Sequence, residues 1–116
     1  MRIHFLAAAV ACWIVLGGPG GIAAAADAPQ KPGEKEKCPV CGMFVAKYPD
    51  WIGEIIFTDG STFFFDGAKD LFKYYFGLDK YNPQKKVADI ASIFVTEYYD
   101  MELIDARSAF FVIGSD

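Results

Sequence analysis

The chain has 116 residues, in which 15 acidic residues outnumber 11 lysines and arginines and only one histidine occurs. This length supports one small domain. The net charge of −4 argues against nucleic-acid binding, which requires a clustered basic face.

The N-terminus has the features of an export signal. Arg2 precedes an apolar run from Ile3 to Leu16, and the small residues before Asp27 suit signal peptidase. This run of 14 residues is shorter than the roughly 20 residues that a membrane-spanning helix needs. We therefore predict a signal peptide over residues 1–26 and an exported protein. The alternative is an uncleaved segment that keeps the protein at the membrane.

Cleavage changes the inventory of reactive side chains. His4 and Cys12 would be lost, which leaves Cys38 and Cys41 as the only thiols of residues 27–116. The net charge becomes −5, since ten basic residues then accompany 15 acidic ones. Without histidine, the chain has no Cys–His or Ser–His nucleophile pair, no imidazole base and no haem attachment motif. We expect a non-catalytic protein, whose metal site within one chain must use sulfur, carboxylate or backbone oxygen.

The composition changes at residue 38. Residues 27–37 are polar and contain two prolines and a glycine, which is typical of a flexible tether. The N-terminal signal and this tether are expected to be disordered. The structured, metal-binding domain is predicted to cover residues 38–116.

Residues 52–66 predict a β-hairpin. The dipeptide Asp59-Gly60 favours a tight two-residue turn, in which both central positions take positive φ. Alternation gives the hairpin two apolar faces, one with Ile55, Phe57, Phe63 and Phe65 and the other with Ile56 and Phe64. This pattern indicates a sheet that is covered on both sides or that pairs with a partner.

A helix is predicted from Gly67 to Phe76, with Asp66 as its N-cap and Gly77 at its end. We interpret Asp66 and Asp70 as acids that favour the start of this helix. Four apolar side chains at helical spacing form the stripe expected to pack on the sheet: Ala68, Leu71, Phe72 and Tyr75. A polar loop is expected over residues 78–89.

Two further strands are predicted, at residues 90–99 and 109–114, because both segments are rich in β-branched and aromatic residues. Residues 100–108 connect them, with one helical turn capped by Asp105. The resulting order predicts a small α+β sandwich of ββαββ type. The last strand has nothing to cover it. We therefore expect that the protein self-associates through the uncovered sheet or that the chain is truncated.

Residues 37–44, KCPVCGMF, hold two thiols at a spacing that can close on one ion. Structural zinc and iron–sulfur clusters normally take four Cys or His ligands, and only two thiols are present. A thioredoxin-like redox pair normally follows the first strand of a βαβ unit, whereas this pair precedes every predicted strand. A Cys38–Cys41 disulfide would close a small, strained and reducible ring. A thiol–disulfide redox function stays open as the alternative.

Of the ions considered, monovalent copper needs the fewest protein ligands. Cu(I) is soft, selects thiolate and thioether, and accepts few ligands. Cys38, Cys41 and Met43 supply two thiolates and a thioether, and Met101 is a candidate fourth ligand. Core packing is the alternative role of both methionines.

Three stretches resemble the NosL family, the copper-binding accessory proteins of nitrous oxide reductase. They are CPVCGMFVAKYPDW, EIIFTDGSTFFFDGAKDLFKYY and FVTEYYDMELIDARSAFFVIGSD. Cys38, Cys41 and Met43 match the family's CxxCGM signature. The resemblance implies a periplasmic chaperone that carries Cu(I) towards the reductase, with the reductase or its assembly machinery as partner. It also implies the fold that NosL proteins share with organomercurial lyase.

The sequence departs from the family at its C-terminal end. Family members continue past the segment that matches VIGSD into a further half, which supplies at least one candidate methionine ligand and covers the sheet. We therefore expect the chain to be a C-terminally truncated member, whose uncovered aromatic side chains favour association.

Overall fold

The structure is a computed structural model that describes residues 28–114. The predicted signal peptide, its cleavage site and the alternative membrane anchor lie outside these residues. Among the helices of residues 28–114, none combines the length and the apolarity that crossing a bilayer requires.

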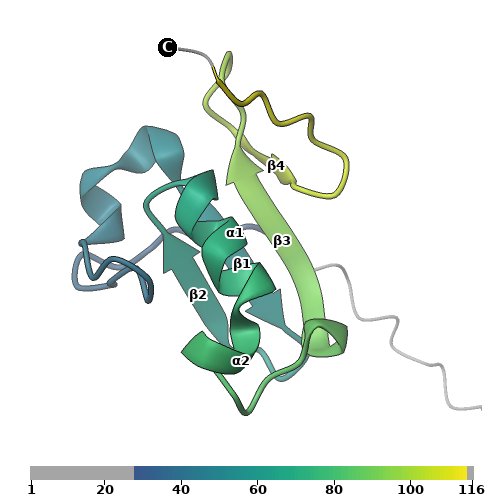
Figure 1. The fold of residues 1–116 in the computed structure, drawn as a ribbon. Helices are drawn as coiled ribbons and strands as arrows, with labels where there is room; N and C mark the ends of the chain where they lie inside the picture. The colour runs from purple at the N-terminus through teal and green to yellow at the C-terminus, as the bar shows by residue number, and fades with distance from the viewer. Residues whose placement is uncertain (1–27, 115–116) are drawn as a thin grey trace, which may run out of the picture.

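The centre of the fold is one antiparallel sheet of four strands (Figure 1). The strands are β1 (Gly53–Phe57), β2 (Thr62–Phe65), β3 (Ile90–Thr96) and β4 (Leu103–Asp105), in the order β2-β1-β3-β4. Helix α1 (Ala68–Phe76) lies on one face, and the short helix α2 (Leu78–Tyr81) follows it. Three short 3-10 helices complete the described elements: η1 (Val45–Lys47), η2 (Pro49–Trp51) and η3 (Val87–Asp89). This architecture confirms the predicted α+β class.

The hairpin has the predicted faces and a different turn. Ile55 lies opposite Phe63, so the two side chains share a face of the sheet. The loop has three residues, because the Phe57 and Ser61 backbones pair and the Gly60 N–H donates to the Phe57 carbonyl. Within this loop, Gly60 alone takes a positive φ, of 83°, while the Asp59 carboxylate accepts bonds from the Ser61 N–H and hydroxyl. The predicted two-residue turn is therefore wrong, because these bonds favour a three-residue turn with glycine last.

The helix packs on the sheet through a residue that the predicted stripe omits. Tyr74 is completely buried, and its ring centroid lies 5.5 Å from Phe63 and 5.2 Å from Phe65. Its hydroxyl accepts a hydrogen bond from Asn82, at 3.1 Å. Of the predicted stripe, Leu71 is buried and the other three side chains are half-buried. The aromatic face of the hairpin therefore also packs against Tyr74, which lies outside the predicted stripe.

The segment after α1 is not the loop that its polar composition predicts. Residues Leu78–Tyr81 form α2, in which Leu78 is buried and the Tyr81 ring stacks 5.9 Å from Tyr74. The prediction of a loop is wrong there, because these two side chains extend the core beyond Gly77. The glycine has a φ of −110°, so it ends α1 without the left-handed conformation usual for a terminal glycine.

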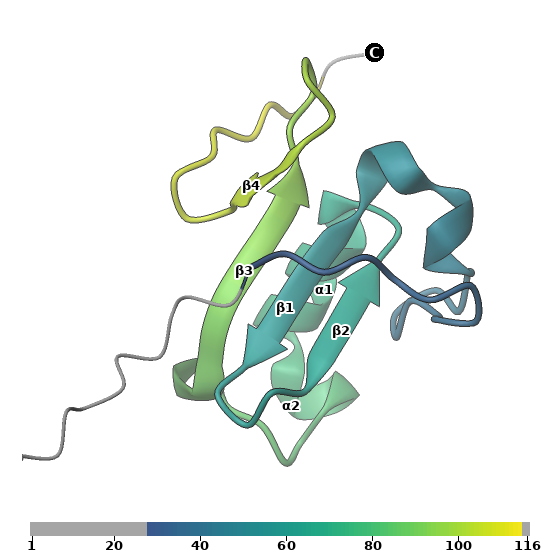
Figure 2. The ribbon, with the colours of Figure 1, turned by 180° about the vertical axis from the view of Figure 1, so that it is seen from behind.

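The opposite face of the sheet carries a buried carboxylate. Glu54 is completely buried, and its two oxygens accept hydrogen bonds from the Gln30 N–H at 3.0 and 3.2 Å. Figure 2 shows the segment that contains Gln30 crossing this face. Residues assigned to the tether therefore contact the sheet, which composition alone does not predict. The domain boundary at residue 38 stays a prediction.

The last predicted strand does not form. Strand β4 lies earlier, where Leu103 pairs with Thr96 and Ile104 pairs with Val95. A tight connection, in which the Glu97 N–H donates to the Glu102 carbonyl at 2.8 Å, brings β4 to the free edge of β3. That edge is then occupied, so residues 109–114 have no partner strand among the described residues. The predicted helical turn is absent: Asp105 ends β4, and its carboxylate accepts a bond from the Arg107 N–H at 2.8 Å in a turn that follows the strand.

Candidate metal centre

The CPVC segment forms a closed loop that is held by its own backbone. The Cys38 N–H donates to the Met43 carbonyl at 2.9 Å, and the Gly42 N–H donates to the Cys38 carbonyl at 2.8 Å. Gly42 has a φ of 77°, and Lys37 and Phe44 pair across the base of the loop. These bonds and the positive φ fix the backbone of the loop that carries both thiols, which lowers the entropy that ligand binding must overcome.

Four potential ligands converge at this loop. One ligand atom from each of Cys38, Cys41, Asp66 and Asp70 can be chosen so that all lie within 4.8 Å of one another. The Cys41 sulfur lies 3.2 and 3.3 Å from the two Asp66 oxygens, and the Cys38 sulfur lies 3.6 Å from Asp70 Oδ2. Cys38 is buried and Cys41 is exposed. The cluster thus has a buried side and a side open to solvent.

The two carboxylates come from the junction of β2 and α1. Asp66 follows β2, and Asp70 lies in the first turn of α1. The predicted N-cap at Asp66 is wrong: Gly67 occupies that position, no side chain caps the helix, and Asp66 accepts a hydrogen bond from Cys41. Sequence reasoning missed both acids as site residues. No local signal marks them as site residues, because Asp66 lies between β2 and the Gly67 N-cap and Cys41 approaches it from a segment far away in sequence.

Desolvation and the two carboxylates together raise the pKa of the Cys41 thiol. Desolvation of the sulfur raises the pKa of Cys41 to about 12, and hydrogen bonds to Asp66, Asp70 and Cys38 act in the same direction. A bond from the Met43 backbone opposes this shift in pKa. Without a cation, the Cys41 thiol therefore keeps its proton at neutral pH. A cation that replaces the proton would also be attracted by the two carboxylates.

The two methionines lie in different places. Met43 belongs to the CPVC loop itself and is half exposed. Met101 lies in the connection from β3 to β4 and lines a cavity whose other residues include Ala46 and Pro49, without either cysteine. The structure thus places Met43 beside the thiols through the backbone, while Met101 belongs to another surface. The roles of both as ligands stay predictions.

The loop geometry makes Gly42→Ala a test of preorganisation. No atom would meet the added Cβ within 4 Å, so the effect comes from φ alone. A left-handed alanine costs roughly 1–2 kcal/mol, and we expect this loss in the free energy of unfolding, with Cu(I) affinity lowered by up to about tenfold. Urea unfolding and Cu(I) competition measure the two effects. Gly33→Ala, at a glycine without positive φ, is the control; equal effects of both changes would contradict the explanation.

Comparisons with known proteins identify the family of the chain. No curated protein and no solved structure gives a significant match to the chain. The sequence profile of NosL matches residues 29–116, which include the CPVC loop, both carboxylates and the whole sheet. The match covers most of the chain and confirms the resemblance seen in the sequence. The chain therefore belongs to the NosL family, which consists of copper-binding accessory proteins.

Proposed function

We propose that this protein is a periplasmic Cu(I) carrier that delivers copper for the maturation of nitrous oxide reductase. The observation that carries the proposal is the preformed loop, which holds two thiols at one point of a domain without histidine. Membership of the NosL family supports a copper-related accessory role. The reductase or its assembly machinery would be the recipient, and copper would be the cargo.

The chemistry of the donors favours a soft cation. Thiolates and thioethers select Cu(I), whereas carboxylates suit harder ions. Cys38, Cys41 and the adjacent Met43 would therefore be the principal ligands. Asp66 and Asp70 would hold the thiol protons before loading and attract the cation afterwards. The exposed side of the cluster, at Cys41, gives a recipient access to the ion.

The exposure of the two thiols favours a carrier over a thiol–disulfide enzyme. An attacking thiol must be accessible and ionised. Cys38 is almost completely buried, with 1% of its surface exposed. The accessible thiol is Cys41, whose pKa is raised, so little thiolate is available for attack at neutral pH. The burial of Cys38 and the raised pKa of Cys41 therefore support the carrier function over the thiol–disulfide alternative.

The proposal is tested by titrating the reduced mature protein with Cu(I) against a competing chelator. We expect one equivalent to bind, and we expect the loaded protein to transfer copper to copper-free nitrous oxide reductase. A small-molecule Cu(I) chelator that sets the same concentration of free Cu(I) is the control for transfer through free solution. Failure to bind one equivalent, or transfer no faster than from the control, would overturn the proposal.

Copper affinity should depend on pH. Because the metal-free Cys41 thiol has a pKa of about 12, binding must release its proton. Acid favours the protonated, metal-free state, so the apparent affinity should rise with pH by up to about tenfold per unit for each proton released. Competition titrations at pH 6, 7 and 8, with a chelator of known proton linkage, measure this slope. An affinity that does not change with pH would show that the thiols are already ionised.

A further inference from the structure

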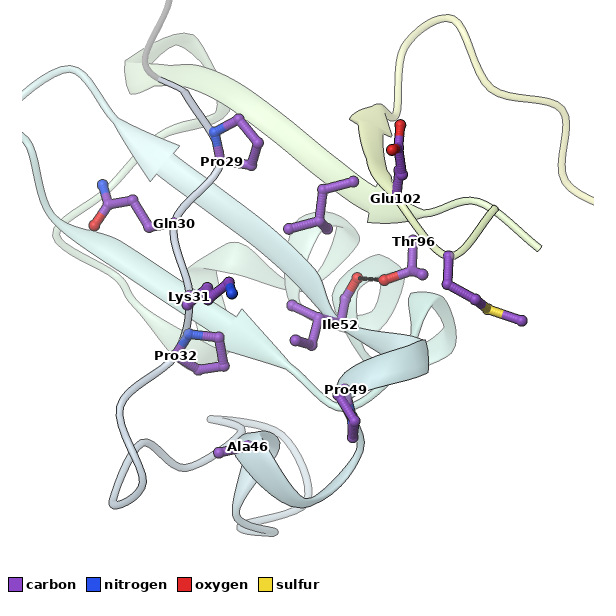
Figure 3. Close-up of a pocket in the computed structure, with 11 residues that line it drawn as sticks. Pro29, Gln30, Lys31, Pro32, Ala46, Pro49, Ile52, Thr96 and Glu102 are labelled. Carbon is purple, nitrogen blue, oxygen red and sulfur yellow. Dashed lines mark hydrogen bonds between the residues drawn. The ribbon is translucent and has the colours of Figure 1, made fainter. Parts of the chain in front are cut away.

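An apolar cavity lies away from the thiol cluster, between the N-terminal segment and the connection from β3 to β4. Its volume is about 560 Å³, within the range of small binding sites. Figure 3 shows Pro29 and Pro32 on one wall, Glu102 across from them, and Ile52 between the walls. Met101 and Leu103 also line it. The cavity is therefore mainly apolar, with one carboxylate at its border.

The connection of residues 97–102 contributes Met101 and Glu102 to the cavity lining and also carries two exposed tyrosines. Tyr98 is 70% exposed and Tyr99 is 86% exposed, and their rings contact each other edge to face at 5.5 Å. The Glu97 carboxylate holds the connection in shape by accepting bonds from the Tyr99 and Asp100 N–H groups, at 2.8 and 2.7 Å. Exposed, preorganised tyrosines are typical of binding surfaces, because they bury large area with little loss of entropy.

The same connection concentrates negative charge. Glu97, Asp100 and Glu102 lie within six residues, and no lysine or arginine occurs between Lys86 and Arg107. The backbone bonds from Asp100 and Tyr99 keep the pKa of Glu97 below its ordinary value, so it stays anionic at neutral pH. Lys31 is the one cationic side chain on the cavity wall, on the N-terminal segment. A positively charged partner would therefore be attracted to the side of residues 97–102.

We propose that residues 97–102 and the adjoining cavity form a docking surface for a partner protein that offers a basic segment with an apolar side chain. The apolar side chain enters the cavity, and the basic residues face Asp100 and Glu102. The inference rests on the proposed function, since Ala46 and Pro49 line this cavity and follow the CPVC loop closely in the chain. A partner docked here would lie next to the segment that leads to the metal loop.

The test is an NMR titration of the ¹⁵N-labelled mature protein with a peptide of one leucine between two pairs of lysines. We expect shifts at residues 97–102 and at the cavity, and an affinity that falls with salt. Asp100→Asn and Glu102→Gln should each weaken binding by about two- to fivefold, and Tyr99→Ala by at least about fivefold. Asp79→Asn, which neutralises an exposed acid on α2, should leave the affinity unchanged.

Three results would overturn the proposal. The first is equal binding of a peptide with glutamates in place of the lysines. The second is equal binding of a peptide with glycine in place of the leucine. The third is a set of concentration-dependent shifts at residues 97–102 without peptide, which would make a second copy of the chain the occupant. Tyr99 is mostly exposed, so its removal should keep the core intact, and thermal unfolding checks this.

A copper titration of the Asp100→Asn/Glu102→Gln double variant separates this inference from the proposed function. Neither acid belongs to the thiol cluster, so Cu(I) affinity should match that of the unaltered protein. Met101 is kept in every variant because it is a predicted ligand. Loss of peptide binding with intact copper binding assigns docking to residues 97–102. If the unaltered protein binds the peptide but does not bind Cu(I), the carrier function is wrong and the docking surface is still supported.

Discussion

Replacing both Cys38 and Cys41 with serine is expected to lower the Cu(I) affinity by at least about 10⁴-fold. The reason is that four-ligand zinc sites of small domains contribute about 10–16 kcal/mol, so that losing two thiolates should remove at least about 5.5 kcal/mol. The measurement is competition with a Cu(I) chelator under reducing conditions. Serine is close in size to cysteine, so the buried position of Cys38 should still pack.

The matched control is the double variant Asp66→Asn/Asp70→Asn. Both carboxylates border the same cluster, but oxygen is a poor ligand for Cu(I), so we expect affinity to change by no more than about tenfold. The contrast with the serine variant identifies the donor type. If the asparagine variant loses as much Cu(I) affinity as the serine variant, the carboxylates contribute to binding as strongly as the thiols, and the assignment of a sulfur-only Cu(I) site is wrong.

The largest effect on stability is expected for Tyr74→Ala. Tyr74 is completely buried and contacts three aromatic rings, of Phe63, Phe65 and Tyr81. Removing a buried aromatic side chain typically lowers the free energy of unfolding by about 3–5 kcal/mol. Small domains are stable by only about 5–15 kcal/mol, so this variant should be close to unfolding. The shift of the urea midpoint at constant slope measures the change.

Two variants of the same helix calibrate this effect. Tyr74→Phe keeps the ring and removes the hydrogen bond from Asn82, so the expected loss is about 0.5–1.5 kcal/mol. Phe76→Ala removes a ring that is 79% exposed, and the expected change is within about 0.5 kcal/mol. A loss for Tyr74→Ala as small as that for Phe76→Ala would mean that α1 does not pack on the hairpin as described.

Local patterns predicted the parts of the fold that depend on neighbours in sequence. The alternation in residues 52–66 predicts a hairpin because a strand turns its side chains to opposite faces, and Ile55 does lie opposite Phe63. The apolar stripe in residues 67–76 predicts α1 because residues three and four apart lie on the same side of a helix. The turn at Asp59-Gly60 and the strand at 109–114 failed, because each was decided by competition. The hydrogen bond from the Ser61 N–H to the Asp59 carboxylate favours the three-residue turn. Strand β4 pairs with the edge of β3, so residues 109–114 cannot pair there.

In the candidate site, the sequence also predicted the residues that are close together in the chain and missed those that are far apart. The spacing of Cys38 and Cys41 is local, so the sequence alone identified the thiols and their softness as ligands. Asp66 and Asp70 read as acids at a helix start, because nothing in their neighbourhood shows that Cys41 approaches from 25 residues away. A stretch between η2 and α1 had to fold as a hairpin before the loop and the helix could meet.

The sequence by itself determined the α+β class, the thiol pair, the absence of histidine from the domain, and the family. Each of these depends on composition or on spacing along the chain. Only the tertiary structure decided that two carboxylates border the thiols, that Tyr74 fills the core, and that an acidic, tyrosine-bearing connection adjoins an apolar cavity. The physical reason is that these features depend on contacts between distant segments, which form only when burial of the whole sheet selects one arrangement among those that local preferences allow.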